Sequence, residues 1–412
     1  MMAAPGSLRD ITPTQWRVLL AAMLGWMLDA MDVMLYAFAL TTIRVEFSLS
    51  GAQAGLLASV TLLTSAAGGL AFGVLADRIG RARALRYSIL VYSLFTALTA
   101  TSGTLSALVF WRALVGIGLG GEWSAGSVLV AETWPAEHRG KAIGLMQSGW
   151  AIGTILAALS AAFVLPRFGW RPLFVLGLLP ALLTLWIRRH VPEPEAWRSA
   201  RAQASAPGMT GLLELVRAPL VRRTVAATML TTCVLFAYWG LFTWVPAYLA
   251  SPLAQGGAGM SLVRSTAWII PMQVGAFFGY VSFGWIGDRL GRRPAFVAFV
   301  LAAAVLVPVY GQAGRHEAVL MVLGPLVGFF GHGYFSVFGA LLAELFPGAV
   351  RGAAQGFCYN AGRAVSALAP LTIGALADVR GIGSALALTS AFFVAASFLI
   401  FLLPETRGEA LR

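Results

Sequence analysis

Charge is scarce in this chain, and the scarcity argues against an ordinary soluble fold. Asp, Glu, Lys and Arg together make up 11% of the 412 residues, whereas hydrophobic residues make up 58%. A soluble domain normally carries about twice that charged fraction. Only two cysteines are present, Cys233 and Cys358, and both fall in long apolar runs. Neither a disulfide framework nor a cysteine-based metal site is therefore expected.

In place of charge, the chain has long apolar stretches from one end to the other. Each is long enough to cross roughly 30 Å of hydrocarbon as a helix, whereas barrel strands would be about ten alternating residues. The first stretch is long and lacks a small-residue cleavage site, so no cleavable signal peptide is expected. We predict an all-α membrane protein with twelve transmembrane helices, at residues 17–40, 51–75, 84–101, 104–131, 140–166, 170–189, 222–250, 262–288, 294–312, 317–344, 351–377 and 382–403.

The formal net charge of +12 would suggest nucleic-acid binding in a soluble protein, but its distribution favours another interpretation. With the N-terminus placed inside, most of the 29 Lys and Arg residues fall on cytoplasmic connections, which is the positive-inside bias of membrane proteins. We therefore expect a bacterial inner-membrane protein with both termini in the cytoplasm. Its expected partner is the lipid bilayer and not nucleic acid.

A ten-residue motif occurs twice, half a chain apart. GVLADRIGRA begins at Gly73 and GWIGDRLGRR begins at Gly284. Two further pairs keep the same register to within one residue: Glu132 with Glu344, and Pro192-Glu193 with Pro404-Glu405. Such matches predict a tandem duplication. The predicted organisation is a six-helix half at 1–189, a cytoplasmic linker at 190–221 and a second six-helix half at 222–412.

Two six-helix halves, a mid-chain loop and GxLxDRxGRR-like motifs after the second and eighth helices resemble the major facilitator superfamily over essentially the whole chain. The resemblance implies a monomeric transporter without cofactor or metal, which is not an enzyme and works by alternating access. The repeated charges could also be simple helix-end caps and topology signals. The residues that the resemblance assigns to a cytoplasmic gate are Gly73, Asp77, Arg78, Arg81, Glu132, Arg139, Gly284, Asp288, Arg289, Arg292, Glu344 and Arg351.

Few ionisable residues fall within the predicted helices, and each needs a reason because insertion costs about 2.5–3.5 kcal/mol. They are Asp29, Asp32, Arg112, Glu122, His332 and Arg363. The residues that lie 211 or 212 positions from Asp29, Glu122 and Arg363 in the other half are not charged, although the scaffold motifs recur. We therefore expect specialised halves, with proton-linked groups in the first and an anion-binding arginine in the second.

The first helix contains two carboxylates, Asp29 and Asp32, one turn apart on nearly the same face. Two carboxylates so close in a low dielectric do not both ionise readily, which predicts a proton site. The pair resembles the Asp-Gly-Phe-Asp of aromatic-acid and sialic-acid proton symporters, with Ala30-Met31 here in the middle. The alternative is a structural pair bonded to Arg112.

The fourth helix contributes Glu122 within Gly118-Leu-Gly-Gly-Glu-Trp123, which also resembles those organic-acid symporters. Glu122 either relays the proton or neutralises Arg112. For Arg112, which lies in a superfamily-like RxxxGxG pattern, a coupling or structural role is favoured over substrate contact, although it stays among the candidate site residues.

The eleventh helix carries Tyr359-Asn360-Ala361-Gly362-Arg363, similar to a pattern in sialate and related carboxylate symporters. A guanidinium binds a carboxylate through two parallel hydrogen bonds, so Arg363, Asn360 and Tyr359 are predicted to recognise the substrate. Pairing of Arg363 with Asp29 or Glu122 in the resting state is compatible with that role.

Four further residues are candidates for the substrate site: His332, Tyr238, Trp239 and Tyr334. Histidine serves as a hydrogen-bonding group or a pH sensor, and the aromatic side chains would line a cavity. The alternative for all four is ordinary structural packing.

The resulting hypothesis is proton-coupled symport of a small organic acid anion, such as a monocarboxylate, sialate or an aromatic acid. A sugar/proton symporter, suggested by Pro404-Glu405-Thr-Arg-Gly408, and a drug or metabolite efflux antiporter are the alternatives. A membrane sensor or enzyme is a remote alternative, because no metal-spaced His/Glu cluster, Ser-His dyad or nucleotide loop is present in the sequence.

Overall fold

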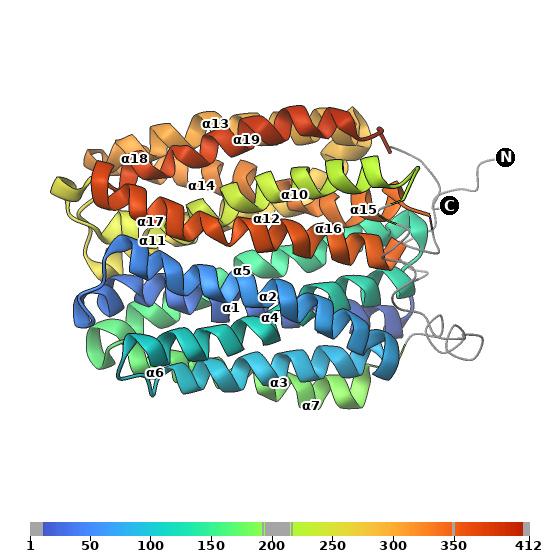
Figure 1. Ribbon diagram of the computed structural model, residues 1–412, viewed down its shortest axis with the longest axis horizontal. Helices are drawn as coiled ribbons and strands as arrows, with labels where there is room; N and C mark the ends of the chain where they lie inside the picture. Colours follow the sequence, from blue (N-terminus) through green and yellow to red (C-terminus); the bar gives the residue numbers. More distant parts are fainter. Residues whose placement is uncertain (1–10, 192, 194–214, 216, 348–350, 407–412) are drawn as a thin grey trace.

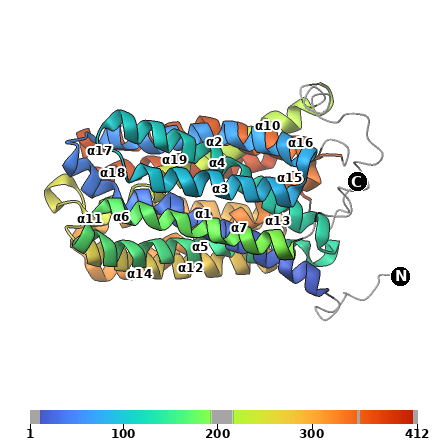
Figure 2. The ribbon, with the colours of Figure 1, turned by 90° about the horizontal axis from the view of Figure 1, so that it is seen from below.

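The helices of this protein run side by side along one long axis (Figure 1), and a view turned by 90° shows the same arrangement (Figure 2). The computed structural model describes residues 11–191, 193, 215, 217–347 and 351–406, and over these ranges it contains no strand. We call the end where α7 stops at His190 and α10 starts at Val221 the linker end, and the opposite end, where α1 stops, the Glu46 end.

The first half has six segments of membrane length. They are α1 (Pro13–Glu46), α2 (Gly51–Ile79), α3 (Arg81–Thr99), α4 (Leu105–Thr133), α5 (Ala136–Phe168), and a sixth made of α6 (Trp170–Val175), a 3₁₀ turn (Leu176–Leu178) and α7 (Leu179–His190).

The second half also has six segments, and four of them are interrupted along their length. They are α10 (Val221–Phe242) with α11 (Val245–Ala250), α12 (Leu262–Leu290), α13 (Arg292–Gln312), α14 (Glu317–Gly333) with α15 (Phe335–Leu345), α16 (Arg351–Ser366) with α17 (Leu368–Arg380), and α18 (Ile382–Leu386) with α19 (Leu388–Leu399) and a 3₁₀ turn (Ile400–Leu402).

These twelve segments match the twelve predicted helices, and the all-α membrane fold is confirmed. Most ends agree within four residues, but α1 continues to Glu46, beyond the predicted end at residue 40. At its other end, a capping box between Thr12 and Gln15 starts the helix before the apolar run begins. Ten segments among the described residues are long and apolar enough to cross a membrane, and the other two, α3 and α16–α17, carry more polar residues.

The two halves meet along a few long helices. In Figure 1 the first half fills the lower part of the bundle and the second half the upper part. The main contacts between them join α5 to α12, and α2 to α16 and α17. Of the helices that carry candidate substrate and proton residues, α16 lies directly in this interface.

The duplicated motifs build the same corner at the linker end of each half. Gly80 and Gly291 follow α2 and α12 with φ of 112° and 97°, a conformation that favours glycine, and the next helix begins at once. The Glu193 carboxylate accepts hydrogen bonds from two backbone N–H groups in the first turn of α3, both at 3.1 Å. The Glu405 carboxylate does the same for α13, at 3.1 and 3.0 Å. Each carboxylate thus satisfies N–H groups that a helix start leaves open.

Candidate functional site

A cavity of about 40 Å³ lies between the two halves near the middle of the bundle. Helices α1, α2, α4 and α5 of the first half and α10 and α16 of the second contribute to its wall. Its charged and hydroxyl-bearing lining comprises Asp29, Tyr36, Thr61, Ser65, Arg112, Thr243 and Arg363, and three indole rings, Trp26, Trp150 and Trp239, form much of the rest.

Asp29 and Arg363 come from opposite halves and share this cavity. Asp29 is only 3% exposed and Arg363 only 5%, and the two side chains interact electrostatically. Asp29 Oδ1 and Arg363 Nε have no hydrogen-bond partner among the described residues. Since a buried charge is costly unless it is paired, each group stabilises the other while leaving hydrogen-bonding capacity for a ligand.

Asp32 has different surroundings from Asp29, although it lies only one turn away. Its Oδ2 accepts a hydrogen bond from the Thr96 hydroxyl of α3, and it interacts electrostatically with Arg112. Asp32 does not line the cavity. The structure therefore separates the predicted carboxylate pair, with Asp29 at the interface between the halves and Asp32 inside the first half.

Arg112 is held in place by neighbours of the first half. Its Nε donates to Thr61 Oγ1 at 3.1 Å, and its guanidinium carbon lies 4.9 Å from the centroid of the Tyr36 ring. The Tyr36 hydroxyl donates in turn to the Ala54 carbonyl at 2.7 Å. Arg112 thus presents a fixed positive charge on the cavity wall, on the side toward the Glu46 end.

Glu122 is buried behind the cavity rather than in its wall. It lies against Gly25 of α1, where a Cβ atom would collide with its carboxylate. Neither Glu122 oxygen makes a hydrogen bond of ordinary geometry to the described residues, but the Tyr92 hydroxyl of α3 lies beside the carboxylate, and the group also interacts electrostatically with Asp29. Burying a carboxylate is costly unless it is paired and hydrogen-bonded, so Glu122 needs a functional or structural reason at this position.

Of the motif in α16, only Arg363 reaches the cavity. The Tyr359 ring lies 4.9 Å from the Arg363 guanidinium and stacks on Trp123 of α4, with ring centroids 3.9 Å apart and planes 14° apart. Asn360 donates from Nδ2 to the Gly356 carbonyl at 2.9 Å. Its Oδ1 lacks a hydrogen-bond partner within the described ranges.

His332 is fully buried in an aromatic cluster beside the cavity. Its Nδ1 is 3.0 Å from the Gly328 carbonyl; because a carbonyl only accepts, this bond places the proton on Nδ1. The ring lies 4.1 Å from Phe242 and 5.2 Å from Tyr238, centroid to centroid. Among the other aromatic candidates Trp239 lines the cavity, whereas Tyr238 and Tyr334 belong to the packing behind it.

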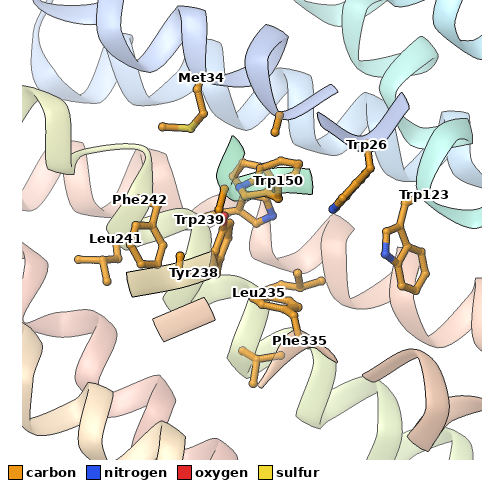
Figure 3. Close-up of a cluster of buried hydrophobic side chains, with 14 of the residues drawn as sticks. Trp26, Met34, Trp123, Trp150, Leu235, Tyr238, Trp239, Leu241, Phe242 and Phe335 are labelled. Carbon is orange, nitrogen blue, oxygen red and sulfur yellow. The ribbon is translucent and has the colours of Figure 1, made fainter. Parts of the chain in front are cut away.

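Trp26 and Trp150 line the cavity but were not singled out from the sequence. The ring centroids of Trp26 and Trp150 are 4.7 Å apart, and those of Trp150 and Trp239 are 5.9 Å apart; Figure 3 shows these side chains in the buried cluster. Trp26 precedes Asp29 by three residues, a spacing that places both on one helix face and that could have identified it. No comparable signal marks Trp150.

At the Glu46 end, hydrogen bonds and an ion pair join the second half to the first. Asp378, in α17, accepts hydrogen bonds from the backbone N–H groups of Gly51 and Ala52, at 2.9 and 3.1 Å, and lies 3.7 Å from an Arg44 nitrogen. Residues 51 and 52 open α2, where unsatisfied N–H groups and the helix dipole favour a carboxylate. This clamp holds the two halves together at the Glu46 end.

The predicted gate lies at the linker end and is only partly described. A Cβ atom at Gly73 or Gly284 would meet no described atom within 4 Å, so these glycines do not pack closely against the described residues. Arg78 and Arg289 are exposed, and Arg78, Arg81 and Arg292 each have an interacting partner. The side chains of Asp77, Glu132, Arg139, Asp288, Glu344 and Arg351 lie outside the described part of the structure.

The fold and the midplane cavity define a membrane transporter, and comparison with known proteins identifies its family. The model of the Major Facilitator Superfamily matches residues 22–307 and 265–412. The chain belongs to this superfamily, and it is a multi-pass membrane transporter rather than an enzyme.

Two relatives and one solved structure are similar over nearly the whole chain. A probable 4-methylmuconolactone transporter of Cupriavidus pinatubonensis is 35% identical, over 97% of this chain and 93% of that protein. A cis,cis-muconate transport protein of Acinetobacter baylyi is 33% identical, over 89% of each. The structure of the proton:xylose symporter XylE covers 97% of this chain and 98% of its own, with a TM-score of 0.78 and 20% identity; at that identity it supports the fold alone.

Proposed function

We propose that this protein is a proton-coupled symporter of an organic acid anion, working by alternating access. The observation that carries the proposal is the buried Asp29–Arg363 pair, whose members come from opposite halves and face one cavity. A proton acceptor and an anion receptor that neutralise each other provide the basis for coupling, because binding at one changes the charge balance of the other.

The proposed cycle exchanges the partner of Arg363. The carboxylate of the substrate binds the Arg363 guanidinium in a planar, two-bond arrangement and displaces Asp29. Asp29 then takes a proton, with Glu122 as the nearby buried relay and Asp32 as a further acid within the first half. The loaded site is electrically neutral overall, so the desolvation cost of rocking the halves past it falls.

The size of the cavity fits a closed stage of this cycle. Ligand pockets usually measure about 300–1,000 Å³, whereas this cavity measures about 40 Å³. Substrate therefore enters only after the halves separate at one end. Release of the Asp378 clamp would open the Glu46 end. Separation of the two corners that end the repeated motifs of Gly73 and Gly284 would open the linker end.

An organic acid is favoured over a sugar for two reasons. The two relatives are named for muconate and 4-methylmuconolactone, and the cavity wall carries two buried arginines, Arg112 and Arg363. The Pro404-Glu405 pattern that suggested a sugar porter recurs as Pro192-Glu193. Its glutamate caps a helix at the linker end in both halves, and neither glutamate lines the cavity.

The orientation and surroundings form part of the proposal. We place both termini and the linker of 190–221 in the cytoplasm of a bacterium, and the twelve residues of the repeated motifs at the cytoplasmic gate, with the protein a monomer in the inner membrane. The basis is the positive-inside bias of the sequence. In this orientation the Glu46 end faces outward.

The test is uptake by proteoliposomes with an imposed inward proton gradient. Labelled cis,cis-muconate, benzoate, lactate, sialic acid and glucose are compared, and a proton ionophore serves as the control. Gradient-driven accumulation of an acid that the ionophore abolishes supports the proposal. Accumulation of glucose alone, or acid uptake that is indifferent to the gradient, contradicts it.

A further inference from the structure

Three side chains form a ladder that crosses from one half to the other: Trp123 on α4, then Tyr359 and Arg363 on α16. Trp123 stacks on the Tyr359 ring at 3.9 Å, and the Arg363 guanidinium lies 4.9 Å from the centroid of the same ring. We propose that Trp123 is a positioning residue that holds Arg363 ready for the substrate anion through Tyr359, and only while the halves are closed at the linker end. This inference rests on the proposed function of Arg363.

Trp123 acts at a distance from the substrate. It is 5% exposed and does not line the cavity, whereas Arg363 does. Because its ring and that of Tyr359 are nearly parallel, at 14°, tilting of the tyrosine ring would break the stack. A stacked pair of aromatic rings resists such tilting, so the stack fixes the surface on which the guanidinium rests.

Arg363 needs such support because little else orients it. Its Nε has no hydrogen-bond partner among the residues that the structure describes. Among the described residues its side chain interacts with Tyr359 and with the charge of Asp29, and the substrate would displace the second. Once the anion replaces Asp29, the Tyr359 face remains to keep the guanidinium fork pointing into the cavity, as two-bond recognition requires.

The ladder also connects anion affinity with the conformation of the protein. α16 begins at the linker end, so Tyr359 lies one turn nearer that end than Arg363. Separation of the halves at the linker end pulls Trp123 away from Tyr359, because the two rings belong to different halves. The guanidinium then loses its fixed support, and affinity falls on the side where the substrate is released. Such a difference in affinity between states is what a transport cycle requires.

The experiment measures the KM for acid uptake and for acid efflux in oriented vesicles of the full-length protein. The variants are Trp123→Leu, Trp123→Phe and Tyr359→Leu, together with the Trp123→Leu, Tyr359→Leu double variant. Size-exclusion profiles in detergent report folding, and Trp123→Met takes the place of the leucine variant if that protein is not recovered.

We expect Trp123→Leu to raise the KM for uptake by about tenfold, an effect of the size that a lost aromatic pair produces, with a smaller rise in the KM for efflux. Trp123→Phe keeps a ring to stack and should restore most of the affinity. In the Tyr359→Leu background the Trp123 substitution should add almost nothing, because the two residues act as one unit.

Three results would overturn the positioning role: an unchanged KM in Trp123→Leu, equal rises for uptake and efflux, or effects that add in the double variant. A merely structural tryptophan would lower the amount of folded protein and the maximal rate, without this split between the two sides. If the wild-type protein transports no acid, the proposed function fails and this inference with it. If the wild type transports acid and the variants behave additively, only the inference fails.

Discussion

The linker ends of the two halves are nearly copies of each other, whereas the middles of the halves have diverged. At the linker ends the same glycine turns, Gly80 and Gly291, are followed by helices capped by the same glutamates, Glu193 and Glu405. At the middle, Asp29 and Glu122 of the first half correspond by the 211-residue offset to Gly240 and Gly333 of the second. The two halves therefore share the geometry of their linker ends and differ in the residues at their middles.

Packing in the second half shows that the divergence is structural as well as chemical. A Cβ atom at Gly240 would lie 3.1 Å from a Thr389 methyl carbon and 3.3 Å from Ile373. At Gly333 it would meet the Phe299 ring at 2.5 Å. No acid fits at either position without moving its neighbours. The acidic residues at the middle of the bundle, Asp29 and Glu122, thus belong to the first half, and the second half contributes Arg363 there.

The largest effect is expected from Arg363→Ala, which removes the contribution of the second half to the charge pair. Truncating one partner of a buried, hydrogen-bonded charge pair costs about 2–5 kcal/mol, and in the proposed cycle Arg363 forms such a pair with the substrate carboxylate, so acid uptake should fall by at least about 30-fold. Initial uptake rates in proteoliposomes measure the loss. Arg363→Lys keeps the charge without the planar fork and should lie between the wild type and the alanine variant.

A folding defect is separated from a binding defect by removing both charges. In the Asp29→Asn, Arg363→Ala variant no carboxylate is left unneutralised at Asp29, so the protein should be recovered folded and still not take up acid. Near-normal uptake by Arg363→Ala would show that the arginine has no role in binding the anion.

The next largest effect is expected from Asp29→Asn, which removes the contribution of the first half. The variant should no longer accumulate acid when a proton gradient is imposed, because the proposed proton acceptor is gone, yet it should retain substrate exchange in counterflow. Asp32→Asn is the matched comparison: Asp32 is bonded to Thr96 and lies outside the cavity wall, so it should affect accumulation less.

The comparison between the halves is tested further by moving the acid. Gly240→Asp in the Asp29→Asn background places a carboxylate at the corresponding position of the second half. It should not restore accumulation, because that position is packed against Thr389 and Ile373. Restored accumulation would mean that the halves are still interchangeable at their middles.

The sequence predicted most of the fold, because the signals involved are local and strong. Twelve apolar runs predicted twelve segments, and the motif at Gly73 and Gly284 predicted the duplicated corners. The breaks in the second half, such as those at Tyr334 and Ala367, were not predicted, since they occur within continuous apolar runs. The caps by Glu193 and Glu405 were visible only as a repeated Pro-Glu pair, because the helices they cap lie more than 100 residues away.

The site was only partly predictable, since a charge within an apolar run is visible in a sequence but its partner is not. Asp29 and Arg363 were identified from their place inside apolar helices and from the patterns around them, and pairing between them was one of the alternatives. The difference between Asp29 and Asp32 depends on Thr96 and Arg112, which lie on other helices. Trp150 carries no charge and follows no motif, so only the folded chain shows that it lines the cavity.

A smaller effect is expected at the Glu46 end, where only the second half supplies a clamp. Asp378→Asn loses the charge that Arg44 and the α2 N-terminus favour, a change of about 1 kcal/mol. The population of states open at that end should rise by about fivefold. The measurement is the rate at which an impermeant maleimide labels Ala58→Cys, a cavity position, from the Glu46 side after Cys233 and Cys358 are replaced by serine.

Glu317→Gln provides the matched control for the clamp. Glu317 lies 2.5 Å from Arg264, and both residues belong to the second half. Its substitution breaks an ion pair within that half and should leave the labelling rate unchanged. Equal acceleration by both substitutions would mean that labelling reports general loosening, and the role of Asp378 between the halves would be lost.

The smallest effects are expected from Glu193→Gln and Glu405→Gln. These substitutions test the linker ends, where the two halves have the same geometry. Each substitution weakens one carboxylate cap, worth about 0.5–1 kcal/mol, so the apparent melting temperature in detergent should fall by about 1–3 °C. The two losses should be similar, because each carboxylate binds two N–H groups of a helix start at 3.0–3.1 Å, although Glu405 also accepts a hydrogen bond from the Thr406 N–H at 3.1 Å. They should also add in the double variant, since the sites do not touch.

Uptake should be unchanged in all three variants. If one substitution lowered uptake and the other did not, the linker ends would differ in function despite their shared geometry, and divergence would extend beyond the middle of the bundle.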